Sequence, residues 1–321
     1  MRTMTTRLSR TALAALWVLM AVSANAQRPG GQPPTPPAPA PAQPDFSKVE
    51  IKTTKISSNF YTLEGQGGTI GALVGPDGVL LVDSQFAPLT EKLVAAIRQI
   101  SDGRIRFLIN THVHGDHTGG NENFGKMGVT IFARDELRAR LAHPAPLANG
   151  NPAPAATPAA LPVVTYRGPV TFHMNGEEVE AIPVPLAHTD GDTLVRFPVS
   201  DVLMTGDYFR SLGYPNIDRA NGGSLKGMLE GLGFTIGLTG PNTKVIPGHG
   251  AVTDRAGLIA HRDMIIAIRD RVARLIPQGK TPEEVVAAKL TADYDPRVPG
   301  GAAGNPDRFV GQVYAELKGA R

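Results

Sequence analysis

The sequence contains no cysteine, and aromatic residues make up only 6% of it. Without cysteine the chain forms no disulfide, offers no thiolate to a metal ion and carries no lipid on a thiol. A bound metal ion would have to be held by histidine, aspartate or glutamate. Hydrophobic residues nevertheless make up 41% and charged residues 19%, so the chain has the composition of a globular protein.

Long hydrophobic runs are also lacking. The run at residues 12–22 has eleven residues, against the roughly 20 that a membrane-spanning helix needs. Three arginines precede this run, and Ala24-Asn25-Ala26 follows it with the small-x-small pattern of a cleavage site. We therefore predict a signal peptide at residues 1–26 and an exported protein, periplasmic or secreted. We expect no stable membrane insertion after cleavage.

The mature chain has no excess of one charge. The whole chain has a formal net charge of +3, from 32 basic and 29 acidic residues. Removal of the leader, with its three arginines and no acid, leaves 29 of each. Nucleic acids and anionic membranes need a basic surface. We expect a small-molecule substrate and no nucleic acid, while the oligomeric state stays open.

The composition divides the remaining chain into a linker, a main domain and an extension. Eight prolines in residues 27–44 indicate an extended, flexible linker over 27–46. The main domain is predicted over 47–290, with a Pro/Ala-rich insertion at 143–162 that forms a surface excursion or a flap near the site. Residues 291–321 are expected to form a C-terminal extension that ends in a helix.

Strands and helices alternate through the main domain. Strands are predicted at residues 60–63, 69–74, 79–82, 105–109, 129–132, 170–174, 179–184, 193–197, 202–204 and 244–246. Helices are predicted at residues 89–100, 135–141 and 258–275 and near the C-terminus, each from its apolar stripe. Hairpins combined with helices indicate an α/β sandwich, with sheets inside and helices outside.

One short motif carries the chemistry. Residues 112–117 read His-Val-His-Gly-Asp-His, a pattern expected by chance in about a few of ten thousand chains of this length. His112 and His114 lie two apart on an extended segment and therefore point the same way, so they can chelate one ion. Asp116 and His117 face a neighbouring position.

Three further candidates follow predicted strands, namely His188, Asp207 and His249. Sites in open α/β folds collect at such strand ends. Together with the motif they provide five imidazoles and two carboxylates. This donor set suits two zinc ions that keep open positions for water.

The sequence resembles the metallo-β-lactamase superfamily over roughly residues 56–249, through the H-x-H-x-D-H motif and the later order of His, Asp and His. The resemblance implies an αββα sandwich with two mixed β-sheets inside and helices on both outer faces. It also implies two metal sites. Their ligands would be His112, His114 and His188 in the first, and Asp116, His117 and His249 in the second, with Asp207 bridging them.

The resemblance also narrows the subfamily. β-Lactamases with a cysteine ligand at position 207 are excluded, and another subclass has serine there. A bridging aspartate is instead similar to glyoxalase II and related hydrolases. Persulfide dioxygenases keep the same ligands around one iron, so the resemblance leaves iron open beside two Zn²⁺ per chain.

The function that follows is zinc-dependent hydrolysis of a small carboxyl derivative, an ester, thioester, lactone or amide, by a metal-bridging hydroxide. Asp116 and Asp207 are the catalytic candidates, and Asp116 would orient the water. Asp83, which matches the family's supporting acid, and Asp192 are expected to hold metal-bound imidazoles by hydrogen bonds. Arg210 and Tyr214 are candidates for contact with a substrate carboxylate or oxyanion.

Alternatives remain at this point: a true class B β-lactamase, a mono-iron persulfide dioxygenase, or a protein that holds metal without turnover. The other histidines favour structural interpretations. We expect His261 to be packed on a helix, and His143 and His173 to be structural or solvated.

Overall fold

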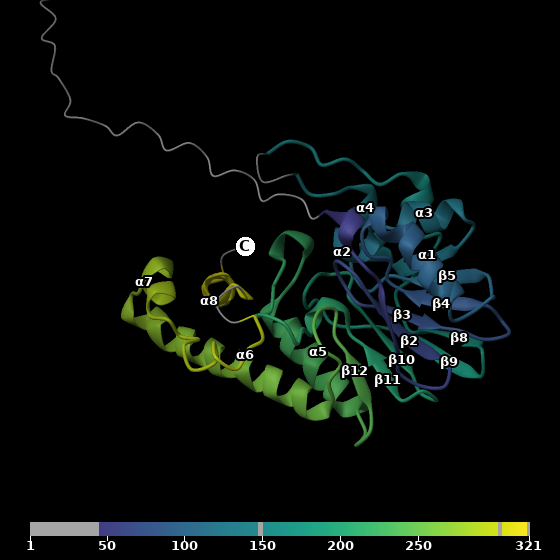
Figure 1. The fold of residues 1–321 in the computed structure, drawn as a ribbon. Coiled ribbons are helices and arrows are strands. Elements are labelled where there is room, and N and C mark those ends of the chain that lie inside the picture. Colours follow the sequence, from purple (N-terminus) through teal and green to yellow (C-terminus); the bar gives the residue numbers. More distant parts are fainter. Residues whose placement is uncertain (1–44, 147–149, 301–303, 320–321) are drawn as a thin grey trace, which may run out of the picture. The chain divides into compact units, whose positions relative to one another are not determined.

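Two β-sheets packed face to face form the centre of the protein (Figure 1). The structure is a computed structural model that describes residues 45–146, 150–300 and 304–319. The predicted signal peptide and residues 27–44 of the predicted linker lie outside the described residues. Asp45–Arg321 forms one compact unit by its internal contacts.

The first sheet is mixed and has seven strands in the described part of the chain. In spatial order these are β1 (Lys52–Lys55), β2 (Phe60–Glu64), β3 (Ile70–Leu73), β4 (Val79–Val82), β5 (Ile105–Ile109), β6 (Thr130–Arg134) and β7 (Val164–Tyr166). Strands β1 to β4 pair antiparallel, and β4 to β7 pair parallel. The sequence did not predict the two edge strands, because β1 is polar and largely exposed and β7 has only three residues.

The second sheet is also mixed. Its order is β12 (Lys244–Ile246), β11 (Val202–Met204), β10 (Thr193–Phe197), β9 (Glu177–Pro183) and β8 (Val170–Met174). Only β11 and β12 pair parallel. Apolar side chains of both sheets, such as Phe60 and Phe197 with ring centroids 4.5 Å apart, form the core between them.

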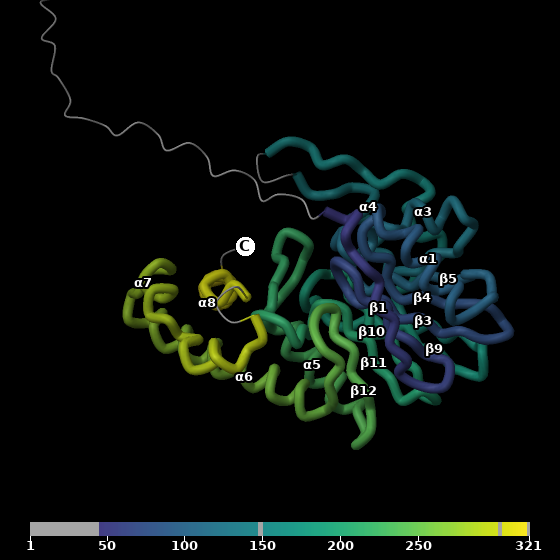
Figure 2. Tube along the Cα trace, viewed as in Figure 1, coloured from purple at the N-terminus to yellow at the C-terminus, as the bar shows by residue number. Residues whose placement is uncertain are grey.

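Helices cover the outer faces of both sheets (Figure 2). On the first sheet these are α1 (Thr90–Arg98), α2 (Gly115–Thr118), α3 (Asn121–Lys126) and α4 (Asp135–Ala142). On the second they are α5 (Leu225–Leu238) and α6 (Arg255–Leu275). Helices α7 (Pro282–Ala287) and α8 (Pro306–Leu317) lie beyond α6, where α8 contacts both α6 and α7. Short 3-10 helices occur at Phe46–Lys48, Ala87–Leu89, Pro158–Ala160, Gly206–Tyr208, Arg219–Asn221 and Ile276–Gln278. The predicted αββα sandwich is confirmed.

The sequence did not predict α5, because four glycines interrupt its apolar pattern. Ser224 caps the helix by accepting a hydrogen bond from the Gly227 amide. A Cβ atom at Gly227 would lie 1.7 Å from the Leu186 carbonyl oxygen. The glycine therefore permits a close approach to a neighbouring loop, and tertiary packing outweighs its low helix propensity.

The predicted C-terminal extension is part of the main core. Phe309 and Val313 of α8 are fully buried and share a hydrophobic cluster with Leu258 and Ile265 of α6. The predicted boundary between residues 290 and 291 therefore corresponds to no break in the packing. The sequence shows the stripe on α8 but not the surface that it covers.

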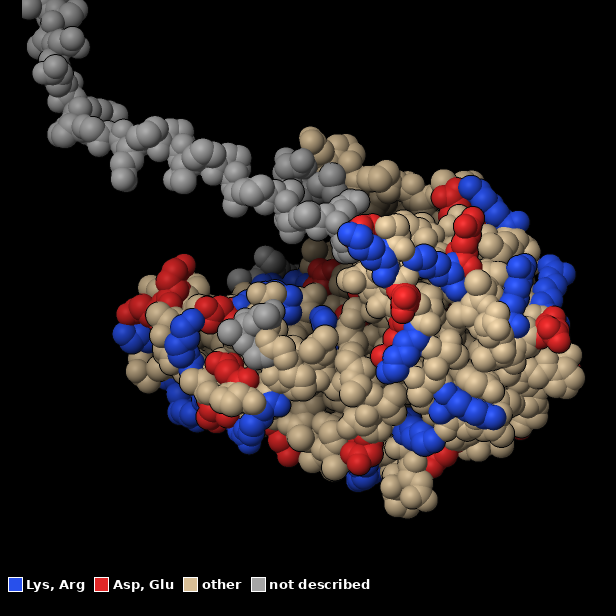
Figure 3. Space-filling view, in the orientation of Figure 1, with Lys and Arg blue, Asp and Glu red and all other residues tan. Residues whose placement is uncertain are grey.

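Residues 147–149 of the predicted insertion lie outside the described residues. Its last part packs against α3, where the Asn121 side-chain amide donates to the Ala160 carbonyl at 3.2 Å. Of the helices that the structure describes, none is both long and apolar enough to cross a bilayer. On the face drawn in Figure 3, basic and acidic side chains are interspersed.

Candidate metal centre

The structure brings all seven predicted metal ligands together at the carboxyl ends of strands. The His112 to His117 motif follows β5, His188 follows β9, Asp207 follows β11 and His249 follows β12. These four strands belong to both sheets, so the site lies where the two sheets end together.

Three imidazoles form the first group. The ligand nitrogens of His112, His114 and His188 all lie within 4.8 Å of one another. The closest pair is Nε2 of His188 and Nδ1 of His114, which are 2.9 Å apart. Three convergent nitrogens of this kind suit one zinc ion with an open fourth position.

Asp116, His117 and His249 form the second group. Nε2 of His249 lies 3.0 Å from Oδ2 of Asp116 and 3.3 Å from Nε2 of His117. His117 is fully buried, while the Asp116 side chain keeps a quarter of its surface exposed. The second group is therefore open to solvent through its carboxylate.

Asp207 lies between the two groups. Its Oδ1 atom is 3.4 Å from Nε2 of both His117 and His249, and its Oδ2 atom is 3.9 Å from Nε2 of His188. One oxygen thus faces each group, which is the arrangement of a carboxylate that bridges two cations.

The outer nitrogens in the first group are fixed by hydrogen bonds. Nε2 of His114 lies 2.7 Å from the Asp218 carboxylate, and Nδ1 of His188 lies 2.7 Å from the Asn216 carbonyl oxygen. Both partners accept, so the ring protons occupy the outer nitrogens. In neutral rings the two inward nitrogens both carry lone pairs, which repel each other at 2.9 Å unless a cation lies between them. This first group fits a metal ion.

Burial keeps His112 and His188 of the first group neutral. It lowers the pKa of His112 well below the usual value and lowers the pKa of His188 to about 4. Nε2 of His112 and Oδ1 of Asp207 are buried without a hydrogen-bond partner among the described residues. Buried polar atoms are rarely left unpaired in proteins, so these two also mark places where a metal ligand bond fits.

Carboxylates around the second group favour the protonated, positively charged forms of His117 and His249. Burial opposes charge on His117, yet Asp83 and Asp207 outweigh it and raise the pKa of this histidine well above its usual value. Burial likewise opposes charge on His249, and Asp207 and Asp116 raise its pKa. A cation bound between these two imidazoles would take the place of those protons.

Asp83 supports the site from a strained backbone position. Its φ angle is 65°, in the left-handed region that residues with a side chain seldom adopt. Its carboxylate accepts from Nδ1 of His117 at 2.7 Å and from the amide and hydroxyl of Thr111 at 2.8 and 2.7 Å. The Thr111 hydroxyl lies 3.1 Å from Nδ1 of His112. The structure thus places Asp83 in direct contact with His117 of the second group and links it to His112 of the first group through Thr111.

Two glycines leave room for the ligands. A Cβ atom at Gly68 would lie 2.1 Å from Cε1 of His117, and one at Gly248 would lie 2.0 Å from Oδ1 of Asp207. Any other residue at these positions would displace a ligand side chain.

The structure corrects the expected contact of Asp192. Its carboxylate accepts from the backbone amide of His188 at 2.6 Å and from the hydroxyl of Thr189 at 2.6 Å. The residue therefore holds the loop that carries His188, while the His188 imidazole is fixed by Asn216.

The two predicted substrate contacts differ in position. Arg210 lies at the site, with Nη1 3.7 Å from Oδ2 of Asp207. Tyr214 is fully buried, and its hydroxyl donates to the Asp295 carboxylate at 2.6 Å. The structure therefore gives no support to a substrate contact by Tyr214, whose role here is to fasten the segment around Asp295.

Asp218 and Asn216 are functional candidates that the sequence did not reveal. Asp218 lies 104 positions after His114, outside any motif. Burial alone would raise its pKa, but hydrogen bonds from His114 and Asn221 outweigh that effect and lower it. The ionised Asp218 therefore strengthens the basicity of the His114 ligand nitrogen.

The insertion borders the site. A cavity of about 400 Å³ beside His114 is lined on one side by Asp218 and on the other by Pro144 and Pro154 of the insertion. Of the remaining histidines, His173 is largely exposed and His143 is exposed at the end of α4. His261 is buried against the Phe209 ring, 5.0 Å between centroids.

The family model of the metallo-β-lactamase superfamily matches residues 64–258, more than half of the chain and all seven candidate ligands. The chain belongs to this superfamily. Within it, the chain is 23% identical over 252 residues to a linear primary-alkylsulfatase of Pseudomonas sp., covering 66% of this chain and 48% of that protein. It is 27% identical over 182 residues to a hydroxyacylglutathione hydrolase of Nitrosococcus oceani, covering 55% of this chain and 60% of that protein.

The chain therefore spans about half to three fifths of the length of these two relatives. Among solved structures, the DIM-1 metallo-β-lactamase has a similar fold. The TM-score is 0.55 at 20% identity, and the match covers 68% of this chain and 99% of that one. This likeness agrees with a metallo-β-lactamase superfamily sandwich and, at that identity, concerns the fold alone.

Proposed function

We propose that the chain is an exported hydrolase that binds two divalent cations, most simply zinc, and cleaves a small carboxyl derivative such as an ester or thioester. The observation that carries this proposal is the position of Asp207, with one oxygen facing each ligand group. Membership of the superfamily supports it, and so does the relative named as a hydroxyacylglutathione hydrolase.

Two bound cations would supply a water of lowered pKa and a Lewis acid for the reacting carbonyl. The chain supplies the positioning. Burial would raise the pKa of Asp116, but the hydrogen bond from His249 outweighs it and lowers the pKa to about 2. Asp116 is thus ionised at neutral pH and a quarter exposed, so it can orient a water molecule by accepting its hydrogen bond.

Arg210 is the group available to a developing negative charge. Its guanidinium is about one fifth exposed and lies 3.7 Å from the bridging aspartate. An arginine at this position would stabilise an oxyanion or a substrate carboxylate by a charge-assisted hydrogen bond. Its contribution is expected in the transition state, so kcat would fall when Arg210 is replaced.

A β-lactam is the second candidate substrate. The leader pattern of residues 1–26 favours it, because β-lactam drugs are met outside the cytoplasm. The aspartate at position 207 favours other carboxyl derivatives as substrates, because a bridging aspartate at this position is similar to that of glyoxalase II and related hydrolases. The two candidates differ in substrate and share the same metal site.

The test combines metal analysis with a substrate panel. The mature protein, with its N-terminus checked by mass spectrometry near Gln27, would be assayed with 4-nitrophenyl acetate, a thioester, a lactone and nitrocefin, with and without a chelator. About two zinc ions per chain with chelator-sensitive ester or thioester turnover would support the main proposal. Nitrocefin turnover alone would favour the second candidate.

A matched pair of variants distinguishes the loss of a metal ligand from a general effect of replacing a histidine. His112→Ala should abolish turnover, because it removes a nitrogen of the first group. His173→Ala replaces an exposed histidine outside the site and should leave turnover unchanged. One iron per chain, or full metal occupancy without turnover on any member of the panel, would contradict the proposal.

A further inference from the structure

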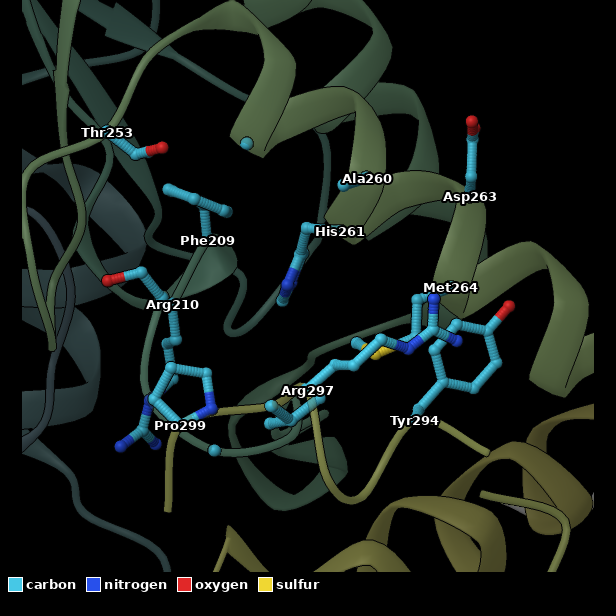
Figure 4. Close-up of a pocket in the computed structure, with 14 residues that line it drawn as sticks. Phe209, Arg210, Thr253, Ala260, His261, Asp263, Met264, Tyr294, Arg297 and Pro299 are labelled. Atoms are coloured by element: carbon cyan, nitrogen blue, oxygen red, sulfur yellow. The ribbon is translucent and has the colours of Figure 1, made fainter. Parts of the chain in front are cut away.

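A second cavity, of about 500 Å³, lies between α6 and residues 294–299 (Figure 4). Its lining is mainly apolar and contains the side chains of Phe209, Ala260, Met264, Tyr294, Val298 and Pro299. Cavities of roughly 300–1,000 Å³ with apolar walls and few polar groups are typical of small-molecule sites.

One wall of this cavity is shared with the metal centre. Arg210 lines the cavity and also lies 3.7 Å from Oδ2 of Asp207. The next residue, Ser211, lines the cavity too, and its backbone amide donates to the carbonyl of His249 at 3.0 Å. Two consecutive residues of the cavity wall therefore lie directly beside two of the candidate metal ligands.

His261 gives the cavity a polar group without a partner. Its residue surface is 8% exposed, and Nε2 is buried with no hydrogen-bond partner among the described residues. Figure 4 shows its ring directed from α6 into the space between Phe209 and Arg297. A buried polar atom left unpaired is costly, so a molecule that supplies the missing hydrogen bond would be stabilised there.

The far rim of the cavity is held in place. The Arg297 guanidinium lies over the Tyr294 ring, 4.8 Å from its centroid, and the Arg271 guanidinium lies 5.2 Å from the same centroid. Met264, at the base, is 5% exposed. The cavity is thus bounded by ordered side chains on the side away from Arg210.

We propose that this cavity binds the apolar acyl or aryl group of the substrate whose carbonyl is cleaved at the metal centre. Apolar walls bind that group, and His261 donates a hydrogen bond to, or accepts one from, a polar atom on it. Arg210 lies beside both the cavity and the metal centre. This proposal rests on the proposed function, because it assigns a substrate class to the same site: esters or thioesters with a sizeable hydrophobic group.

The first arm of the test measures kcat/KM for 4-nitrophenyl esters from acetate to octanoate. In the natural protein kcat/KM should rise with each methylene, by up to about fourfold. Ala260→Trp places an indole in the cavity from an exposed position on α6 and should flatten this series. The matched control is Ala95→Trp, at an exposed position on α1 away from the cavity, which should leave the series unchanged. Ala260→Leu should give an intermediate slope.

The second arm measures binding without turnover. Straight-chain carboxylates from butanoate to decanoate would be used to displace 1-anilinonaphthalene-8-sulfonate from the full mature protein. Affinity should rise with chain length, and Ala260→Trp should weaken decanoate binding at least tenfold while Ala95→Trp does not. Equal affinities in the natural protein and Ala260→Trp would overturn the proposal.

The two arms distinguish the failure of this proposal from failure of the proposed function. If no ester is hydrolysed, the proposed function fails, and the binding arm alone decides whether the cavity takes apolar chains. If esters are hydrolysed at rates independent of chain length, or Ala260→Trp keeps the slope, the metal chemistry stands and the substrate pocket is refuted.

Discussion

In the first ligand group, hydrogen bonds from the outer ring nitrogens of His114 and His188 leave their inner nitrogens free to bind a metal ion. Asp218 accepts from His114, and Asn216 accepts from His188. Such outer contacts orient a ligand and raise its basicity, and their loss typically costs 10- to 100-fold in metal affinity. We therefore expect Asp218 to contribute to metal binding without being a ligand.

Replacing Asp218 should weaken one metal site selectively. Asp218→Ala removes the acceptor of the His114 proton, so affinity at the first site should fall about 10- to 100-fold. Competition against a chromophoric chelator should resolve one weakened and one unchanged site. Asp218→Asn keeps an oxygen acceptor and should lose less. An equal loss at both sites, or none, would count against this role.

His261 makes stability depend on pH. Burial, and then the positive charge of Arg210, lowers its pKa to about 4. The unfolded chain takes up this proton near pH 6.5 and the folded chain only near pH 4, so the folded state loses stability as the pH falls through this window. The loss from this group approaches about 3 kcal/mol below pH 4 and is absent above pH 7.

His261→Leu tests this dependence. Urea unfolding of the natural protein and the variant between pH 7 and pH 4 gives the difference in their unfolding free energies. That difference should shift in favour of the variant as the pH falls, by about 3 kcal/mol at most. A difference that stays constant across the window would refute the assignment.

At the scale of elements, the ends of four strands assemble the site, and α6 and α8 share a hydrophobic cluster with the segment that follows Asp207. Phe309 of α8 is fully buried and stacks on Tyr214, with ring centroids 6.3 Å apart. Tyr214 in turn lies seven residues after the bridging Asp207. Helix α8 therefore supports the segment that follows a candidate metal ligand.

Truncation of Phe309 should destabilise the whole described unit. Phe309→Ala is expected to cost about 3–5 kcal/mol, because it leaves a cavity in the shared core. Leu317→Ala removes a side chain from the same helix that is 38% exposed and should cost about 0.5 kcal/mol or less. Denaturant unfolding followed by circular dichroism measures both. An unchanged main transition in Phe309→Ala would mean that α8 is a separate extension.

At the scale of the whole molecule, bound cations would link the two sheets, because the ligands follow strands of both. A ligand that binds only the folded state stabilises it by about 4 kcal/mol at a free concentration 1,000 times its Kd. The metal-loaded protein should therefore resist unfolding as a unit.

Metal removal provides the check on this linkage. Dialysis against a chelator should lower Tm by roughly 10 °C, since about 1 kcal/mol corresponds to some 2–4 °C in a chain of this size. Added zinc should restore Tm in scanning calorimetry. His112→Ala should show a smaller zinc response than the natural protein, and the exposed-site variant His173→Ala an equal one. An identical Tm with and without zinc would contradict metal binding to the folded state.

The sequence by itself determined what depends on near neighbours. Alternation and turns located most strands, and the spacing of His112 and His114 placed two imidazoles on one side of an extended segment. With the order of the later ligands, this was enough to predict the superfamily and the sandwich.

Only the tertiary structure decided contacts between residues far apart in the chain. The acceptance of the His114 proton by Asp218, the burial of Tyr214 and the cavity beside His261 depend on how loops pack. Helix α5 and the place of α8 in the core were decided in the same way. The physical reason is that packing energy depends on which surfaces meet, and the spacing of residues along the chain does not specify which distant surfaces those are.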